Sequence, residues 1–258
     1  MYRISPTVKQ LLIINVIFFL GTFLSSYLTN DSNSSFIYSL FGLYFPENLN
    51  FKFWQILTHM FMHGNLPHIL VNMFALWMFG SSVESIFGSR NFLFFYLTCG
   101  FGAAISQLGF LYYNYYVDLE FFISNGYESA EIINILNNKS KPEIDSLINS
   151  VGIERVLSIF SNFNSTMVGA SGAIMGILVA FGMFFPESKL MLLFFPIPIK
   201  AKYFIPAIII MDLFSAITGQ AIFSPSNTAY VAHLGGALTG FIIMYYWKKD
   251  RFNKNRWY

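Results

Sequence analysis

Residues 167–173 read Met-Val-Gly-Ala-Ser-Gly-Ala, and they lie at the start of a hydrophobic segment long enough to cross a bilayer. Hydrocarbon cannot satisfy polar groups, so a membrane helix ordinarily avoids them. This one nevertheless begins with Ser171 inside a Gly-x-Ser-Gly pattern. A second hydrophobic segment opens with Ala-His-Leu-Gly-Gly at 232–236, which puts His233 at its start. A serine and a histidine that each open a membrane helix indicate acyl-transfer chemistry within the membrane.

The composition independently indicates a membrane protein. Of the 258 residues, 55% are hydrophobic and 11% are charged, and the mean hydropathy is +0.54. These values lie outside the range of soluble globular chains and predict an all-α polytopic membrane protein. No hydrophilic stretch is long enough to fold separately, so we expect a single membrane domain over 1–258. The lone Cys99 lies in an apolar segment and predicts no disulfide.

The hydrophobic pattern predicts six membrane crossings. A spanning helix needs about 20 mainly apolar residues. The apolar run from Leu11 to Leu28 is too long for the core of a typical signal peptide, so we expect it to remain as the first helix. The six expected helices cover residues 9–29, 66–87, 91–115, 168–185, 202–222 and 231–247.

Lys and Arg set the expected orientation of these helices. Eleven of them fall in the two termini and in the connections between helices 2 and 3 and helices 4 and 5, against four on the other side. Positively charged connections stay in the cytoplasm, so both termini are predicted to be cytoplasmic. Ser171 and His233 then lie at the outer ends of their helices, on the same side of the membrane.

Three connections are unusual. Residues 30–65 are rich in aromatic side chains and are expected to lie in the membrane interface. Residues 116–167 form a polar, acidic external insertion between helices 3 and 4. A capping pattern at 140–143 within it predicts a small helical pair. The two prolines in 195–200 exclude a regular helix and predict an interfacial turn.

Three histidines precede or begin the second helix, at His59, His63 and His68. His68 and Asn72 are four residues apart and therefore share one helix face, near the outer end. One alternative is that these side chains are only interfacial or bond within their helix. Another is a metal site, since His59 and His63 could chelate. The His-Glu-x-x-His pattern of zinc proteases is missing and acidic ligands are scarce nearby, so we expect no metal and no cofactor.

Glycines mark the expected contact between helices 4 and 6. Gly172 and Gly176 are four residues apart, as are Gly236 and Gly240. Small residues at this spacing allow two backbones to pack closely. That contact could be purely structural. It is also what a serine hydroxyl would need to come within about 2.6–3.2 Å of an imidazole.

The carboxylates are poorly placed for a catalytic triad. Asp212 is expected in the middle of helix 5 and Glu84 near the inner end of helix 2. Neither lies at the outer level, so both are interpreted as structural, capping or pairing groups. The sequence therefore favours a Ser–His dyad without an acid.

From about residue 10 to 247, the chain resembles the rhomboid intramembrane serine proteases. Three stretches carry the resemblance in the order of the family: 63–73, with His63, His68 and Asn72; 169–172; and 232–236, followed by Gly240. One departure is Trp54-Gln55, where family members often have Trp-Arg.

The resemblance implies roles for the polar residues. Ser171 would be the nucleophile and His233 the general base. His68, Asn72 and the backbone N–H of Ser171 would form the oxyanion hole, with His63 and Gly169 supporting it. A helix N-terminus offers free N–H groups to such an oxyanion.

The expected function is an intramembrane serine endopeptidase that cleaves single-pass membrane proteins in or near their transmembrane segments. Its expected partners are those substrates and the lipid bilayer, with no nucleic acid. A bacterial inner membrane is expected, with an organellar membrane as the alternative, and the active site is expected toward the outer face. The alternatives are a non-catalytic rhomboid-like protein that binds membrane clients, and a small transporter, which would need polar groups through the membrane depth. Substrate identity and oligomeric state stay open.

Overall fold

The structure, a computed structural model, describes residues 4–29, 36–192, 195–220 and 229–254. The first half of the chain contains α1 Pro6–Thr29, α2 Phe36–Phe41, β1 Leu43–Tyr44, α3 Gln55–Thr58, the 3-10 turn η1 His59–Phe61, α4 Leu66–Ala75, the π-helical segment η2 Leu76–Gly80, α5 Ser81–Phe87 and α6 Ser89–Ser124. The second half contains α7 Ser129–Asn138, α8 Lys141–Val151, α9 Ile153–Phe163, β2 Thr166–Met167, α10 Ser171–Phe184, β3 Lys189–Leu192, β4 Phe195–Lys200, α11 Ala201–Thr218 and α12 Ala229–Lys254.

The protein is an all-α polytopic membrane protein, as its composition predicts. Four described helices or helical stretches are long and apolar enough to cross a membrane: Pro6–Leu28, Leu66–Phe87, Ser89–Ser124 and Ala201–Thr218. The apolar helix α10 is shorter, at 14 residues. The full count of six crossings and the cytoplasmic position of the termini stay predictions.

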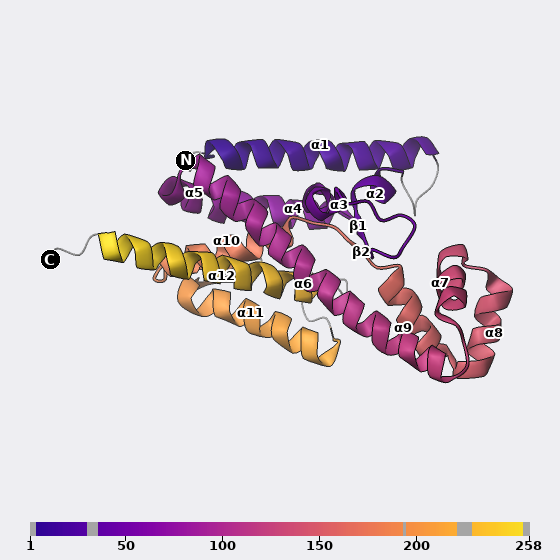
Figure 1. Cartoon of the computed structure of the whole chain (residues 1–258). Coiled ribbons are helices and arrows are strands. Elements are labelled where there is room, and N and C mark those ends of the chain that lie inside the picture. The colour runs from indigo at the N-terminus through magenta and orange to yellow at the C-terminus, as the bar shows by residue number, and fades with distance from the viewer. Residues whose placement is uncertain (1–3, 30–35, 193–194, 221–228, 255–258) are drawn as a thin grey trace.

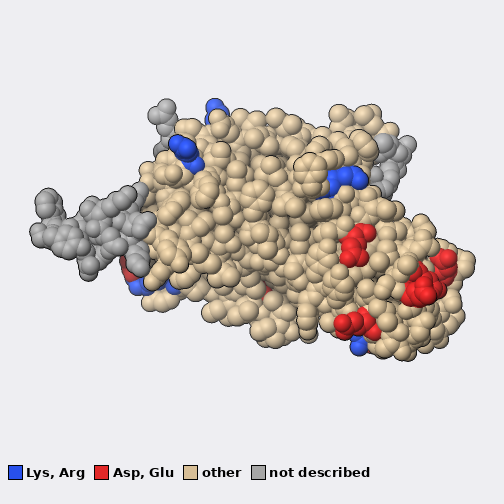
Figure 2. Space-filling view, viewed as in Figure 1, with Lys and Arg blue, Asp and Glu red and all other residues tan. Residues whose placement is uncertain are grey.

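Helices α1, α11 and α12 run in roughly similar directions, α6 crosses them obliquely, and α7, α8 and α9 project at one end (Figure 1). The start of α1 and the end of α12 lie together at the opposite end. In Figure 2 Asp and Glu gather at the α7–α9 end, and much of the surface between the two ends is uncharged. This distribution of charge fits a molecule that crosses a bilayer lengthwise.

Helix α6 is longer than expected and links the membrane bundle to the projecting end. It has 36 residues, or about 54 Å at 1.5 Å per residue, against a hydrocarbon core of about 30 Å. The prediction ended this helix at 115. It continues because Leu119 and Phe122 are buried against the projecting helices. The first part of the predicted insertion therefore belongs to α6, and the rest forms three helices rather than a pair.

Helix α10 packs against both α6 and α12, which also contact each other directly. Every residue from Gly172 to Phe181 is buried. A Cβ atom added to Gly240 would lie 2.6 Å from the Cα of Gly176, and one added to Gly176 would lie 2.3 Å from the Sγ of Cys99. Side chains larger than hydrogen therefore do not fit between these backbones.

The projecting end has a core of its own. Its buried residues come from the far half of α6, from α7–α9 and from Phe45 of the first loop: Phe45, Leu111, Tyr115, Leu119, Phe122, Ile132, Ile135, Leu136, Leu147, Val156, Ile159 and Phe163. Because the first loop contributes to this core, the projecting helices and that loop are packed as one layer at this end of the molecule.

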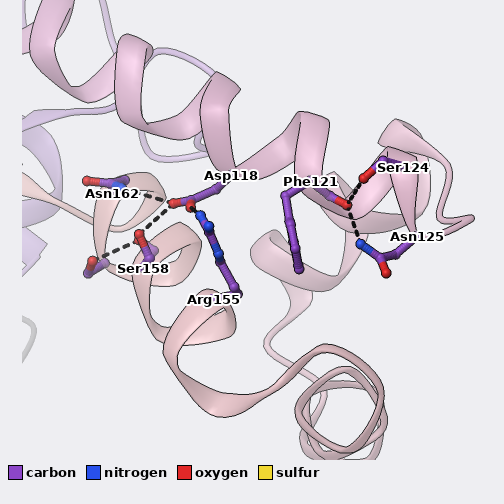
Figure 3. A network of polar contacts seen from close by, with 8 residues as sticks. Asp118, Phe121, Ser124, Asn125, Arg155, Ser158 and Asn162 are labelled. Carbon is purple, nitrogen blue, oxygen red and sulfur yellow. Dashed lines mark hydrogen bonds and ion pairs between the residues drawn. The ribbon is translucent and has the colours of Figure 1, made fainter.

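A buried carboxylate fastens α9 to α6. The Asp118 side chain is 4% exposed and lies 3.3 Å from an Arg155 guanidinium nitrogen (Figure 3). It also accepts hydrogen bonds from the hydroxyl of Ser158, at 2.6 Å, and the amide of Asn162, at 3.4 Å. All three partners lie on α9, so the second half of the insertion is oriented by a residue of the long helix.

Gln55 organises the first loop. Its side chain is fully buried. The amide donates to the carbonyls of Ser39 and Asn50, and its oxygen accepts from the backbone N–H groups of Tyr44 and Lys52. Four backbone segments of the loop thus meet on one side chain, at the position where the family resemblance leads one to expect arginine.

The stretch 195–200 is an extended strand rather than an irregular turn. β4 pairs antiparallel with β3, with Lys189 opposite Lys200. Both strands of a two-stranded sheet are edge strands, so the prolines at 196 and 198 are tolerated there. Glu187 lies just before this hairpin and pairs with Lys200 at 2.7 Å and Lys202 at 2.5 Å.

Candidate active site

The beginning of α4 fixes the orientation of His68. The side-chain oxygen of Asn65 caps the helix by accepting a hydrogen bond from the backbone N–H of His68, at 2.8 Å, and Pro67 occupies the first turn. These are favoured residues at a helix start. The N–H of Gly64 donates to Nδ1 of the His68 ring at 3.4 Å. With Nδ1 accepting, the proton of the neutral ring is on Nε2.

Gly169 brings His68 beside Ser171. Its φ angle is +123°, which favours glycine. A Cβ atom at this position would lie 2.9 Å from Nε2 of His68 and 3.6 Å from Oγ of Ser171. The imidazole therefore covers the glycine where a side chain would otherwise stand, with the serine hydroxyl next to it.

Ser171 is the first residue of α10. The preceding cap residue, Ala170, has no side-chain hydrogen bond to the helix. The first N–H groups of a helix have no partner inside it, and the helix dipole places positive potential at the same end. The start of α10 can therefore accept a developing negative charge beside the serine.

The segment that leads into Ser171 is held on the first loop by backbone contacts. The N–H of Gly169 donates to the carbonyl of His59 at 2.9 Å. Two residues earlier, β2 pairs antiparallel with β1, with Met167 opposite Leu43. This role of His59 cannot be predicted from the sequence, because any residue can supply a backbone carbonyl.

His233 lies on the first turns of α12, and its imidazole forms a hydrogen bond that the sequence did not predict. Nδ1 is 3.1 Å from Oδ2 of Asp212 on α11. Since a carboxylate accepts, Nδ1 carries the proton and Nε2 has the free lone pair. Nε2 is buried and forms no hydrogen bond with any described residue, so the hydroxyl of Ser171 is not bonded to it in this state. Such contacts are often long in free enzymes.

The expectation that Asp212 lies away from the site is wrong. Helix α11 ends at Thr218, with Gly219 in the left-handed conformation, four residues before the expected end at 222. That shorter helix leaves Asp212 less than two turns from its end, level with the first turns of α12. Glu84, by contrast, caps the start of α1 by accepting from the N–H groups of Thr7 and Val8, each at 2.9 Å.

Asn72 is buried one turn after His68 on the same helix. Its side-chain amide donates to the carbonyl of His68 at 3.1 Å. An amide NH₂ group has two hydrogens, so this bond leaves one of them available. The recorded contact of Asn72 is thus within α4, and its part in an oxyanion hole stays a prediction.

His63 and His59 are buried beside this group. The ring of His63 packs edge-on against that of His68, with ring centroids 5.0 Å apart. Nδ1 of His59 donates to the carbonyl of Gln55 at 2.9 Å. Burial lowers the pKa of His63 to about 3 and that of His59 to about 4, so both rings are neutral at pH 7. In the described residues, no three His, Cys, Asp or Glu side chains are grouped to hold a metal ion.

A cavity of about 660 Å³ opens beside the start of α4. Its walls come from α1, α2, the turn before α4 and the first residue of α4: Phe19, Leu20, Thr22, Phe23, Ser26, Tyr38, His63, Gly64, Asn65 and Leu66. Because His63 and Gly64 both line this cavity and contact His68, it adjoins the polar group around Ser171.

Comparison with known proteins gives a consistent result. A family model described as Rhomboid domain matches residues 50–127 and 147–249. The chain is 27% identical over 186 residues to the presenilin-associated rhomboid-like protein, mitochondrial, of Bos taurus, covering 72% of this chain and 36% of that protein. It is 25% identical over 193 residues to Rhomboid protein 1, mitochondrial, of Saccharomyces cerevisiae, covering 75% and 41%.

A shorter match has 36% identity over 59 residues to the rhomboid protease GluP of Bacillus subtilis, covering 23% of this chain and 12% of that protein. The chain thus spans about two fifths or less of the length of these relatives. The family match includes the positions of His68, Asn72, Ser171, Asp212 and His233.

Proposed function

The chain belongs to the rhomboid family, and we propose on this premise that it is a serine endopeptidase that cleaves single-pass membrane proteins in or near their transmembrane segments. The family includes intramembrane serine proteases and acts on membrane proteins within the bilayer. The observation that carries the proposal for this chain is the position of Ser171. It starts a helix with the ring of His68 beside it across Gly169.

The proposed reaction begins with attack of Ser171 Oγ on the scissile carbonyl carbon. His233 Nε2 takes the hydroxyl proton as the new C–O bond forms, and the carbonyl electron pair moves onto oxygen. When the C=O bond re-forms, the C–N bond breaks and the proton on Nε2 passes to the leaving amine. Water then attacks the acyl-enzyme, with the same nitrogen accepting its proton and returning it to Oγ.

The oxyanion would lie at the start of α10. The Nε2–H of His68 and the backbone N–H of Ser171 are donors at this place. Fixed donors stabilise the charge that develops in the transition state, and removing one such donor typically costs about 100- to 1,000-fold in rate. Asn72 is proposed as a further donor through its second amide hydrogen.

The protein is an integral membrane protein, and we propose that its active site faces the outer side. The projecting helices and the start of α10 lie toward the end opposite the start of α1 and the end of α12, which is expected to be cytoplasmic. A bacterial inner membrane stays a prediction, and two of the relatives carry mitochondrial names. Fractionation of the native cell, with a protease-accessibility assay of both termini, tests compartment and orientation together.

The test of the function uses the full chain, purified and reconstituted in lipid vesicles with a tagged single-pass substrate. Wild type, Ser171→Ala, His233→Ala and the control Ser161→Ala, at an exposed position of α9, are compared. We expect cleavage by wild type and by the control, and none by the two site variants when all four have equal thermal stability. A fluorophosphonate probe should label Ser171 in the wild type.

Two outcomes would contradict the proposal. Cleavage by folded Ser171→Ala at the wild-type rate would remove the serine from the mechanism. A folded wild type that cleaves none of a panel of substrates and is not labelled by the probe would leave a non-catalytic protein that binds membrane clients.

A further inference from the structure

We infer that Asp212 is a positioning residue for His233, so that the site is a Ser171–His233–Asp212 triad rather than a dyad. This inference rests on the proposed function. Asp212 does not contact the reacting atoms, and its proposed role is to orient His233, the general base.

The contact joins two helices at one buried point. Asp212 is 8% exposed, and its Oδ2 lies 3.1 Å from Nδ1 of His233. In the described part of the chain, His233 is the only hydrogen-bond partner recorded for this carboxylate. Asp212 is also the only acidic residue of α11, whose remaining charged residue, Lys202, belongs to the first turn.

A buried carboxylate within the membrane helix α11 is energetically unfavourable unless it has a compensating partner. Removing an ionised carboxylate from water costs several kcal/mol unless a partner compensates, and acidic residues within membrane helices are rare for that reason. The packing of α12 does not require it, because the glycines already bring α12 against α10. What Asp212 adds is a hydrogen bond to one specific nitrogen of one specific histidine.

That hydrogen bond selects the tautomer that the reaction needs. With the proton on Nδ1 held by Asp212, the lone pair is on Nε2, which is buried and unpaired among the described residues. When Nε2 takes the proton of Ser171, the ring becomes an imidazolium with both nitrogens protonated. Nδ1–H stays on the ring, and the adjacent carboxylate stabilises the new positive charge without accepting a proton.

The first test measures kcat and KM of reconstituted Asp212→Asn, Asp212→Glu and wild type. Asparagine fills the same space but removes the charge and presents an NH₂ group that favours the wrong tautomer. In soluble serine proteases, replacing the aspartate of the triad by asparagine lowers kcat about 10⁴-fold. We expect kcat to fall at least about 100-fold with KM within about twofold, and Asp212→Glu to recover part of the loss because it keeps the charge.

The control is Ser215→Ala, one turn further along α11. Ser215 is also buried, at 3% exposure, but among the described residues its hydroxyl bonds only to the carbonyl of Met211, within its own helix. A purely structural role for Asp212 predicts lowered thermal stability and no selective loss of kcat. Folded Asp212→Asn with kcat within twofold of wild type would overturn the inference.

A second measurement needs no Asp212 variant and no activity. The chain has four histidines, so ¹⁵N-histidine solid-state NMR of wild type against His233→Gln isolates the signal of His233. The inference requires the Nδ1–H tautomer with a strongly hydrogen-bonded proton. An Nε2–H tautomer would refute it even if the protein cleaves. A wild type that shows the Nδ1–H tautomer but cleaves no substrate would refute the proposed function, whereas the hydrogen bond between Asp212 and His233 would still be supported.

Discussion

Gly236 of α12 lies directly against the backbone of Gly172 of α10, so closely that a Cβ atom on Gly236 would fall 1.9 Å from the Gly172 carbonyl oxygen. A backbone atom cannot turn aside as a flexible side chain can. The close packing of the two helices that carry His233 and Ser171 therefore requires glycine, without a Cβ atom, at position 236.

Gly236→Ala is expected to lower the melting temperature and to abolish cleavage, because α12 must move away from α10 and carry His233 with it. The matched control is Gly109→Ala on α6, where an added Cβ meets nothing within 4 Å. That variant should be as stable as wild type or more so, since alanine is favoured over glycine in a helix by up to about 1 kcal/mol. Thermal unfolding and cleavage are measured for both. An active, fully stable Gly236→Ala would contradict the close contact.

Asn72→Ala and His68→Ala are expected to lower kcat with little change in KM, by up to about 100- to 1,000-fold each, because each removes a proposed oxyanion donor. The control for Asn72 is Asn114→Ala on α6. Asn114 makes the same kind of bond, from its amide to the carbonyl of Phe110 four residues earlier, at 3.0 Å. Equal losses of kcat in Asn72→Ala and Asn114→Ala would show that the effect comes from the helix bond alone.

Stability should fall as the pH is lowered from about 6.5 toward 4. The ordinary histidine pKa is 6.5, and burial lowers the pKa of His59 to about 4 and of His63 to about 3 in the folded chain. Within this window the unfolded chain binds protons on both rings and the folded chain does not, so the free energy of unfolding decreases as the pH falls. Denaturation at a series of pH values measures the slope.

The variant His63→Phe keeps a ring of similar shape and removes one of these titrating groups. Its slope between pH 6.5 and 4 should be smaller than that of wild type. An unchanged slope would mean that His63 does not become protonated on unfolding in this range.

Asp118→Asn is expected to destabilise the projecting end, because the uncharged amide loses the ion pair with Arg155 and cannot accept every bond that the carboxylate accepts. The control is Glu120→Gln, an exposed acid two residues further along α6. The rate of hydrogen exchange in α9 should rise in Asp118→Asn only. If α9 holds the segment before Ser171 in place, the rate of cleavage should fall in the same variant. Identical exchange in the two variants would exclude this role for Asp118.

Several parts of this fold can be predicted from residues alone. Ser171 and His233 each interrupt an apolar pattern with a polar residue at a helix start, and hydropathy marks the long helices. The position of Asp212 could not be predicted in this way. It depends on where α11 ends and on how far that helix is displaced along α12, and neither is encoded in the spacing between residues 212 and 233.

The same limit applies to two other features. The extension of α6 beyond 115 follows from the burial of Leu119 and Phe122 against helices distant in sequence. The central role of Gln55 in the first loop follows from four backbone partners that no sequence pattern identifies. Local patterns predict the helices, whereas contacts between distant segments determine the position of Asp212 beside His233 and the packing of the projecting end.

Cys99 sits where a side chain on Gly176 would stand, at the junction of α6, α10 and α12. It is the only cysteine of the chain, so a thiol reagent labels the wild-type protein at this one position. A membrane-permeant maleimide can reach it only when these helices part. The rate of its modification therefore times the opening of the helix junction beneath Ser171, in the unaltered protein and under the conditions of cleavage.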